Sequence, residues 1–245
     1  MKYLVFIAFI LTFVSCKKSE DRRCMKGAGS EITIERQLND FTKIFIGPNI
    51  HIALIQDSLD KVVITGGENL VNFITSDIIE GELRIENKNK CNFLRSYKHE
   101  VHVEIHLTTL SKIYFEGTKP LTCNSVIKGN NLSVVVRDGA GEVALNLDFN
   151  NLDYTVTNGW GNFVLKGDVD KLNLNIWSNG FGDAYGLHVA NDLEVVSTTA
   201  GLIKVNGEGA NMKVEISSIG DVWYVGNPAD LLYTKYGSGE LLDKN

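Results

Sequence analysis

The second half of the chain repeats itself about every twenty residues. Six segments each begin with alternating apolar and polar residues and then reach a turn that contains glycine. The segments begin at Leu132, Leu152, Leu172, Leu193, Met212 and Leu231. Their turn glycines are Gly141, Gly161, Gly182, Gly201, Gly220 and Gly239, at spacings of 20, 21, 19, 19 and 19 residues. A unit this short cannot bury an apolar face alone, so the repeats must pack on each other.

The apolar positions within each repeat predict how the repeats pack. In a strand, the residue that opens a segment and the residue two positions later point to the same side. At the later position the segments carry Val134, Tyr154, Leu174, Val195, Val214 and Tyr233. Coils stacked about 4.8 Å apart would align both positions in one core. The sequence therefore predicts an all-β solenoid of roughly 20-residue coils, in which the turn glycines supply positive φ at the corners.

An antiparallel fold is the alternative. The dipeptides Asp138-Gly139, Asn158-Gly159 and Asn179-Gly180 are also strong signals for two-residue hairpins. The composition, with 23 Gly and 3 Pro, favours strands joined by tight turns in either case. A β-sandwich or meander differs from the solenoid because it would not align the residues that open successive segments.

Residues 1–15 have the pattern of a lipoprotein signal peptide. A short basic start precedes an apolar run that is shorter than the roughly 20 residues of a membrane-spanning helix. Ser15 then precedes Cys16, as in the lipobox of bacterial lipoproteins, where the cysteine becomes the acylated N-terminus. The alternative is a plain signal peptide with an incidental cysteine. We predict a lipid anchor at Cys16, followed by a tether over residues 16–40, that holds the protein at the outer membrane, on either of its sides.

Charge and cysteine content narrow the possible partners. The formal net charge of −6 argues against nucleic acid as a partner, so lipid rather than charge would hold the chain at a membrane.

Besides Cys16 the chain has Cys24, Cys91 and Cys123, and an oxidising compartment would permit one disulfide, for which Cys91–Cys123 is preferred. No CxxC or Cys/His ligand spacing is present, so we predict no metal site and no cofactor.

Aromatic residues at the turns are the candidate contacts. With the turn glycines aligned, Trp160 and Phe181 occupy the turn tips of neighbouring coils, where two rings could stack on a sugar or on a partner's side chain. Trp177 and Trp223 fall on the outward side of their strands and could contact a glycan or a protein. The alternative for Trp160 and Phe181 is that they pack on each other or fold back over the core. For Trp177 and Trp223 it is burial under the N-terminal strands or a dimer interface.

Residues suited to catalysis are sparse. Arg137 beside Asp138, with Lys166 one coil away, comes nearest to the acidic and basic cluster of polysaccharide lyases built on β-helices. Adjacent strand residues face opposite ways, which weakens that cluster. His102 and His106 share a strand face but lie roughly 13 Å apart, too far for one metal ion. We therefore predict no catalytic residue and no enzyme activity.

Several stretches together carry a family resemblance. They are Phe41-TKIFIGPNIHIALIQ, Leu83-RIE, Val101-HVEIHLTTLSKIYFEG and Val222-WYVGNP. In this order, and with the repeated Gly-x-Gly-polar turns, they resemble the head GIN domain family of auto-transporter adhesins over about residues 41–245. The resemblance implies a right-handed β-helix-like fold in exported proteins, often lipoproteins of the Bacteroidota, and it names no catalytic residues.

These observations divide the chain and suggest its role. We expect a signal peptide (1–15), a tether (16–40), an N-terminal β region (41–110) and a repetitive solenoid (111–245), with 41–245 as one head GIN-like unit. The expected function is a non-enzymatic binding or adhesion module of the cell envelope, whose partner is a glycan or a surface protein. A carbohydrate-active enzyme on a β-helix and an envelope structural or assembly protein are the alternatives.

Overall fold

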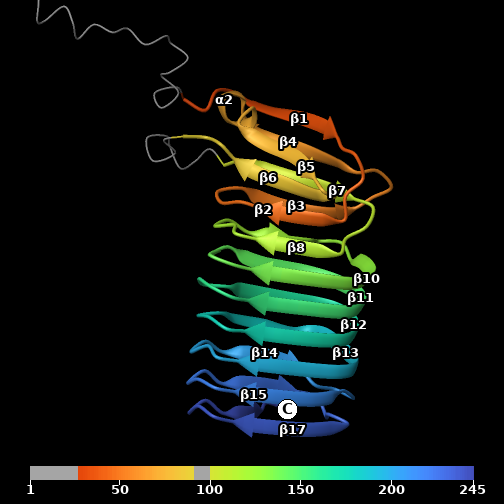
Figure 1. Ribbon diagram of the computed structural model, residues 1–245, viewed down its shortest axis with the longest axis vertical. Coiled ribbons are helices and arrows are strands. Elements are labelled where there is room, and N and C mark those ends of the chain that lie inside the picture. Colours follow the sequence, from red (N-terminus) through yellow and green to blue (C-terminus); the bar gives the residue numbers. More distant parts are fainter. Residues whose placement is uncertain (1–26, 91–99) are drawn as a thin grey trace, which may run out of the picture.

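The computed structural model describes residues 27–90 and 100–245 and is a β-solenoid of about seven turns, with its coils stacked along the long axis (Figure 1). The strands of the described chain form one continuous hydrogen-bonded sheet. One short helix, α2 (Glu68–Val71), lies beside the N-terminal strands. Within the described residues no helix is long and apolar enough to cross a membrane. The predicted all-β solenoid is confirmed.

The four longest strands account for the twenty-residue repeat. They are β10 (Ile127–Val136), β11 (Glu142–Val156), β12 (Asn162–Ile176) and β13 (Phe181–Ser197). Each strand pairs in parallel with the next, and the register places Leu132 beside Leu152, and Leu152 beside Leu172. The parallel register excludes the antiparallel alternative for this part of the chain, because hairpins would have reversed each second strand.

The remaining strands extend the same stack in both directions. Towards the N-terminus they are β1 (Glu31–Gln37), β2 (Lys43–Ile46), β3 (His51–Gln56), β4 (Lys61–Gly67), β5 (Ile74–Ile79), β6 (Glu82–Asn87), β7 (His102–Leu107), β8 (Lys112–Phe115) and β9 (Leu121–Thr122). Towards the C-terminus they are β14 (Ile203–Asn206), β15 (Asn211–Ile216), β16 (Val222–Val225), β17 (Asp230–Lys235) and β18 (Leu241–Asp243).

Two stacks of strands enclose the core. The first stack contains, in order, β6, β2, β8 and β10, then the C-terminal halves of β11, β12 and β13, and finally β15 and β17. The second stack contains, in order, β7, β3 and β9, then the N-terminal halves of β11, β12 and β13, and finally β14, β16 and β18. Both predicted apolar columns point between the stacks, and most of their side chains are buried. In the last coil Leu231 is exposed and Tyr233 is partly buried.

The N-terminal region belongs to the same solenoid. Strand β2 pairs in parallel with β6 and β8, and β3 pairs in parallel with β7 and β9, so the coils begin well before residue 111. The predicted boundary between residues 110 and 111 is therefore not a break in the structure. Antiparallel pairing occurs only at this end of the described chain, where β4 pairs with β1 and β7, and β5 pairs with β6.

The predicted tether extended too far. Residues 31–37 form β1, which pairs with β4 from Glu31 beside Gly67 to Gln37 beside Lys61. Ile32 and Ile34 are partly buried against the core, and this burial draws the segment into the sheet. The predicted signal peptide and the first part of the tether lie outside the described residues.

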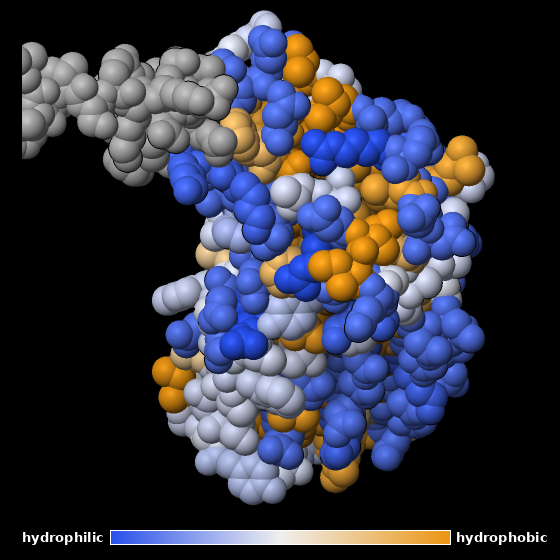
Figure 2. All heavy atoms as spheres, turned by 45° about the horizontal axis from the view of Figure 1, so that its top comes forward, coloured by the Kyte–Doolittle hydropathy of each residue, from blue (hydrophilic) through white to orange (hydrophobic). Residues whose placement is uncertain are grey.

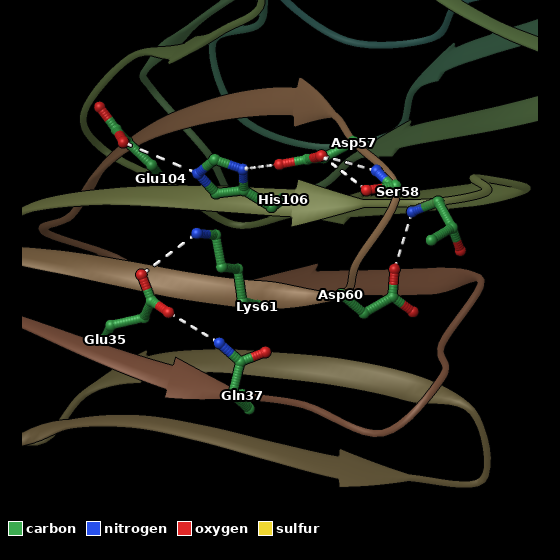
Figure 3. A network of polar contacts seen from close by, with 9 residues as sticks. Glu35, Gln37, Asp57, Ser58, Asp60, Lys61, Glu104 and His106 are labelled. Carbon is green, nitrogen blue, oxygen red and sulfur yellow. Dashed lines mark hydrogen bonds and ion pairs between the residues drawn. The ribbon is translucent and has the colours of Figure 1, made fainter.

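Buried and surface carboxylates tie the N-terminal strands together (Figure 3). Asp60 is buried and accepts hydrogen bonds from the backbone N–H groups of Phe41 (3.3 Å) and Thr108 (2.7 Å). Asp57 lies 2.9 Å from Nδ1 of His106. The backbone hydrogen bond from Ser58 and then the contact with His106 hold the pKa of Asp57 below its usual value. The connection from β3 to β4 is therefore held to β7 by side chains as well as by backbone pairing.

The corner glycines are required for close approach and not for positive φ. A Cβ at Gly201 would lie 2.4 Å from the carbonyl oxygen of Gly180, and a Cβ at Gly220 would lie 2.3 Å from that of Gly201. Neither glycine has a positive φ, so the expected backbone role was wrong at these corners. The column also runs from Gly161 through Gly180 to Gly201, whereas Gly182 lies over the ring of Phe163.

Replacing Gly220 by Ala tests this close approach. The added methyl group collides with a backbone oxygen that the neighbouring coil holds in place, so we expect the free energy of unfolding to fall by about 1–3 kcal/mol. Thermal and urea denaturation measure the change. Gly27→Ala is the control, because a Cβ there meets nothing within 4 Å. Equal stability of the two variants would contradict the packing.

Tyr154 offers a second test of the core. Its side chain is fully buried, its hydroxyl has no hydrogen-bond partner in the described chain, and burial raises its pKa. Removing an unsatisfied buried hydroxyl relieves a desolvation cost, so Tyr154→Phe should raise the free energy of unfolding by about 1 kcal/mol. Tyr233→Phe is the matched control, since that hydroxyl donates to the carbonyl of Gly239 and its loss should give no gain. A destabilised Tyr154→Phe variant would contradict this description.

Candidate functional site

Large apolar side chains are exposed along one edge of the solenoid. The turns that follow the first-stack strands project from this edge, at the left in Figure 1. Its exposed residues, which we call the aromatic corner, are Trp160 (65% exposed), Trp177 (54%), Phe181 (44%), Ile219 (67%) and Tyr236 (70%). Elsewhere, on the face seen in Figure 2, hydrophilic residues dominate and hydrophobic ones form small groups.

Trp177 stands where the sequence predicted it. Its backbone N–H donates to the carbonyl of Val156, and the N–H of Thr198 donates to the carbonyl of Ile176. Trp177 therefore lies between Thr157 and Thr198 in one column and points outward. The same column ends at Tyr236, whose N–H donates to Ile216. Tyr236 and Ile219 were not predicted as contact residues, although their positions in the repeat indicated that they lie in the same set of turns.

The predicted pairing of Trp160 with Phe181 was wrong. The register places Phe181 beside Asn162, which is two residues beyond Trp160. Five residues separate Val156 from Asn162, but only four separate Ile176 from Phe181, so the second turn is shorter. No ring contact joins Trp160 and Phe181 in the described chain. Both rings are exposed on adjacent coils, but they occupy different columns.

Trp223 does not belong to the aromatic corner. It lies on β16 between Lys204 and Leu242, and the ammonium of Lys244 sits 4.4 Å from its ring centroid. The residue is partly buried, and its indole N–H is buried without a partner in the described chain. The expected exposure was wrong because a side chain from the chain's last residues covers the ring.

Of the three residues considered for catalysis, Arg137 and Asp138 form an ion pair, but Lys166 lies apart from them. Arg137 contacts its neighbour Asp138 (3.3 Å) and donates to the hydroxyl of Tyr114 (3.3 Å). Lys166 lies instead on the outer face of the second stack, where the register pairs it with Asn146. The three residues therefore do not form one cluster of acidic and basic groups.

The register brings two histidines together that the sequence separates. His51 on β3 pairs with His102 on β7, and their rings stack with centroids 4.7 Å apart. The Nε2 atom of His51 lies 3.1 Å from the carboxylate of Glu100. Lys119 holds the pKa of Glu100 below its usual value, and His51 lowers it further. Within residues 27–90 and 100–245 no group of three metal-ligating side chains is arranged to hold an ion.

Cys123 is buried and has no disulfide partner among residues 27–90 and 100–245. Its sulfur accepts a hydrogen bond from the backbone N–H of Asn146 (2.9 Å), and burial raises the pKa of the thiol. The suggested partner Cys91 lies outside the described residues, as does Cys24. The disulfide between Cys91 and Cys123 therefore stays a prediction.

Comparisons with known proteins agree with the fold. The family model described as "Putative auto-transporter adhesin, head GIN domain" matches residues 40–228. A crystal structure of a "putative adhesin" from Bacteroides fragilis is 22% identical, with a TM-score of 0.79, and the match covers 88% of this chain and 97% of that one. A "putative lipid binding protein" from Parabacteroides distasonis is 18% identical, with a TM-score of 0.63 and coverage of 89% and 98%. A search of curated proteins found no match.

Proposed function

Because the chain belongs to the head GIN domain family, we propose that it is a lipid-anchored protein of the outer membrane that binds a surface partner and catalyses no reaction. The observation that carries the binding role is the aromatic corner. Three aromatic side chains, those of Trp160, Trp177 and Phe181, are exposed on adjacent coils. Exposure of apolar rings to water is unfavourable in free energy, so a partner that covers these rings gains binding free energy.

The solenoid makes the corner a rigid platform. Backbone hydrogen bonds to the neighbouring coil hold the turns on which the rings stand, such as those from Trp160 to Gly139 (3.2 Å) and from Phe181 to Gly161 (3.0 Å). A partner that binds here loses little conformational entropy to ordering of the protein, because the backbone is already ordered. Rigid aromatic side chains of this kind often dominate binding free energy at protein surfaces.

The same corner supports adhesion better than catalysis. The ion pair between Arg137 and Asp138 satisfies both charges, and the arginine is also hydrogen-bonded to Tyr114. The corner itself carries aromatic rings, two indole N–H groups and the hydroxyl of Tyr236, which recognise a surface by contact and hydrogen bonding. This chemistry suits a glycan or a protein partner, and it requires no cofactor.

Removing the three rings tests the role of the corner. The full chain in detergent, with Trp160, Trp177 and Phe181 all changed to Ala, should bind intact bacterial and host cells at least ten-fold more weakly than the wild type, because the apolar contact area is lost. Flow cytometry with labelled protein measures the binding. Leu59→Ala with Ile79→Ala is the control, since these residues are equally exposed elsewhere. Unchanged cell binding by the triple variant would refute the proposed site.

The lipid anchor is tested separately at Cys16. Wild-type protein expressed in a Gram-negative host should incorporate labelled palmitate and sediment with membranes, whereas Cys16→Ala should do neither, because acyl chains supply the attachment. Cys24→Ala serves as the control and should behave as the wild type. Continued sedimentation of unlabelled Cys16→Ala with the membrane fraction would contradict lipid anchoring.

A further inference from the structure

The outer face of the second stack contains a groove beside the aromatic corner. One hollow of about 180 Å³ is lined by residues that include His51, His102 and Thr122. A second hollow of about 260 Å³ is lined by residues that include Thr122, Asn146 and Lys166. Thr122 lines both hollows, and the register places it between Ala53 of the first hollow and Ala144 of the second, so the two hollows are neighbours along the solenoid axis and are together called the groove.

The short strand β9 explains why the groove exists. Beside it, β3 has six residues and β11 has fifteen, but β9 consists of Leu121 and Thr122 alone. The chain leaves the strand conformation after Thr122 and re-enters it at β10. At the coil that contains β9, fewer outward-facing side chains therefore cover the second stack than at coils with a longer strand.

Short side chains form the floor of the groove. The register aligns Ala53 with Thr122, Thr122 with Ala144, and Ala144 with Val164. The stacked rings of His51 and His102 flank one end. Towards the other end, Phe181 of the aromatic corner pairs with Asn162, which lies two residues before the lining residue Val164 on the same face of β12.

Some polar side chains on the groove are unpaired, in contrast to polar side chains beside it. On the same outer face Asn162 donates to Glu142 (2.7 Å), and Lys204 contacts Asp183 (3.1 Å). The side chains of three groove residues have neither a hydrogen bond nor an ion pair in the described part of the chain. These residues are Asn124, Asn146 and Lys166. They offer both donors and acceptors to a ligand.

We infer that this groove binds a segment of an extended oligosaccharide, an inference that rests on the proposed binding function. Sugar hydroxyls both donate and accept hydrogen bonds. They can therefore pair with the free amides of Asn124 and Asn146, which do both, and with the ammonium of Lys166, which only donates. The apolar face of a sugar ring can lie on the Ala and Val floor and on the ring of Phe181. The coils repeat about every 4.8 Å, so successive sugar units meet successive coils.

Other polymers fit the groove less well. A peptide strand binds a free sheet edge, but the strands under this groove are hydrogen-bonded on both sides. Nucleic acid requires several cations, whereas Lys166 is accompanied here by Glu104 and the chain carries a net charge of −6. The groove is therefore best suited to a carbohydrate.

Filling the groove tests the inference. Full chain in detergent is screened on an array of bacterial, plant and animal glycans, and each hit is measured by isothermal titration calorimetry with the free oligosaccharide. Ala144→Trp should weaken binding at least ten-fold, and Asn146→Ala with Lys166→Ala should weaken it several-fold. Thr155→Trp is the control, because Thr155 lies on the same strand but in the first stack. Thermal denaturation establishes that each variant is folded.

The outcomes separate this inference from the proposed function. Absence of any glycan hit, or unchanged affinity in both groove variants, overturns the groove. If cell binding is then still lost on removal of the corner rings, the binding function stands without the groove. Cell binding that is abolished by protease treatment and unaffected by glycosidases also overturns the groove and indicates a protein partner. Failure of both cell and glycan binding refutes the two proposals together.

Discussion

The parallel, in-register hydrogen bonding between consecutive coils is the constraint on which the rest of the structure depends. It turns a distance of about twenty residues along the chain into one strand spacing in space. Inward positions then become continuous apolar columns, such as Leu132, Leu152 and Leu172. Outward positions become columns of surface groups, and turns become one aligned edge. A change at one position therefore acts on the coils above and below it.

The same constraint explains the residues at the corner. Where a coil closes tightly, the next backbone approaches so closely that only glycine fits, as at Gly201 and Gly220. Beside these glycines the chain has no core to fill, and side chains such as Trp177 are free to face solvent. Within each turn, the glycines that allow stacking and the residues that face solvent are therefore different positions. The exposed residues can vary while the stacking is preserved.

The sequence predicted features that depend on periodicity and missed features that depend on distant contacts. The alternation of strand residues and the repeat length were sufficient to predict the solenoid and its core. They could not predict which glycine stacks, because turns of four and five residues both contain glycine and only the register between coils places Gly180, and not Gly182, in the column. Phe181 was misplaced for this reason.

Non-local packing explains the other misses. Trp223 has the sequence pattern of an exposed residue, but Lys244, twenty-one residues later, covers its ring. The stacking of His51 on His102 has no signal in the sequence, because only the β3–β7 pairing brings the two residues side by side. The groove was also invisible in the sequence, since it results from the shortness of β9 relative to its neighbours.

The spacing of coils can be measured directly on the full chain. Spin labels are attached to cysteines introduced at Ser133 and Glu194, or at Ser133 and Leu232, after replacement of the native cysteines. The registers place these pairs three and five strand spacings apart. Pulsed electron paramagnetic resonance should give mean separations that differ by about 10 Å, the rise of two coils. Separations that do not increase with the number of intervening coils would contradict the stacking.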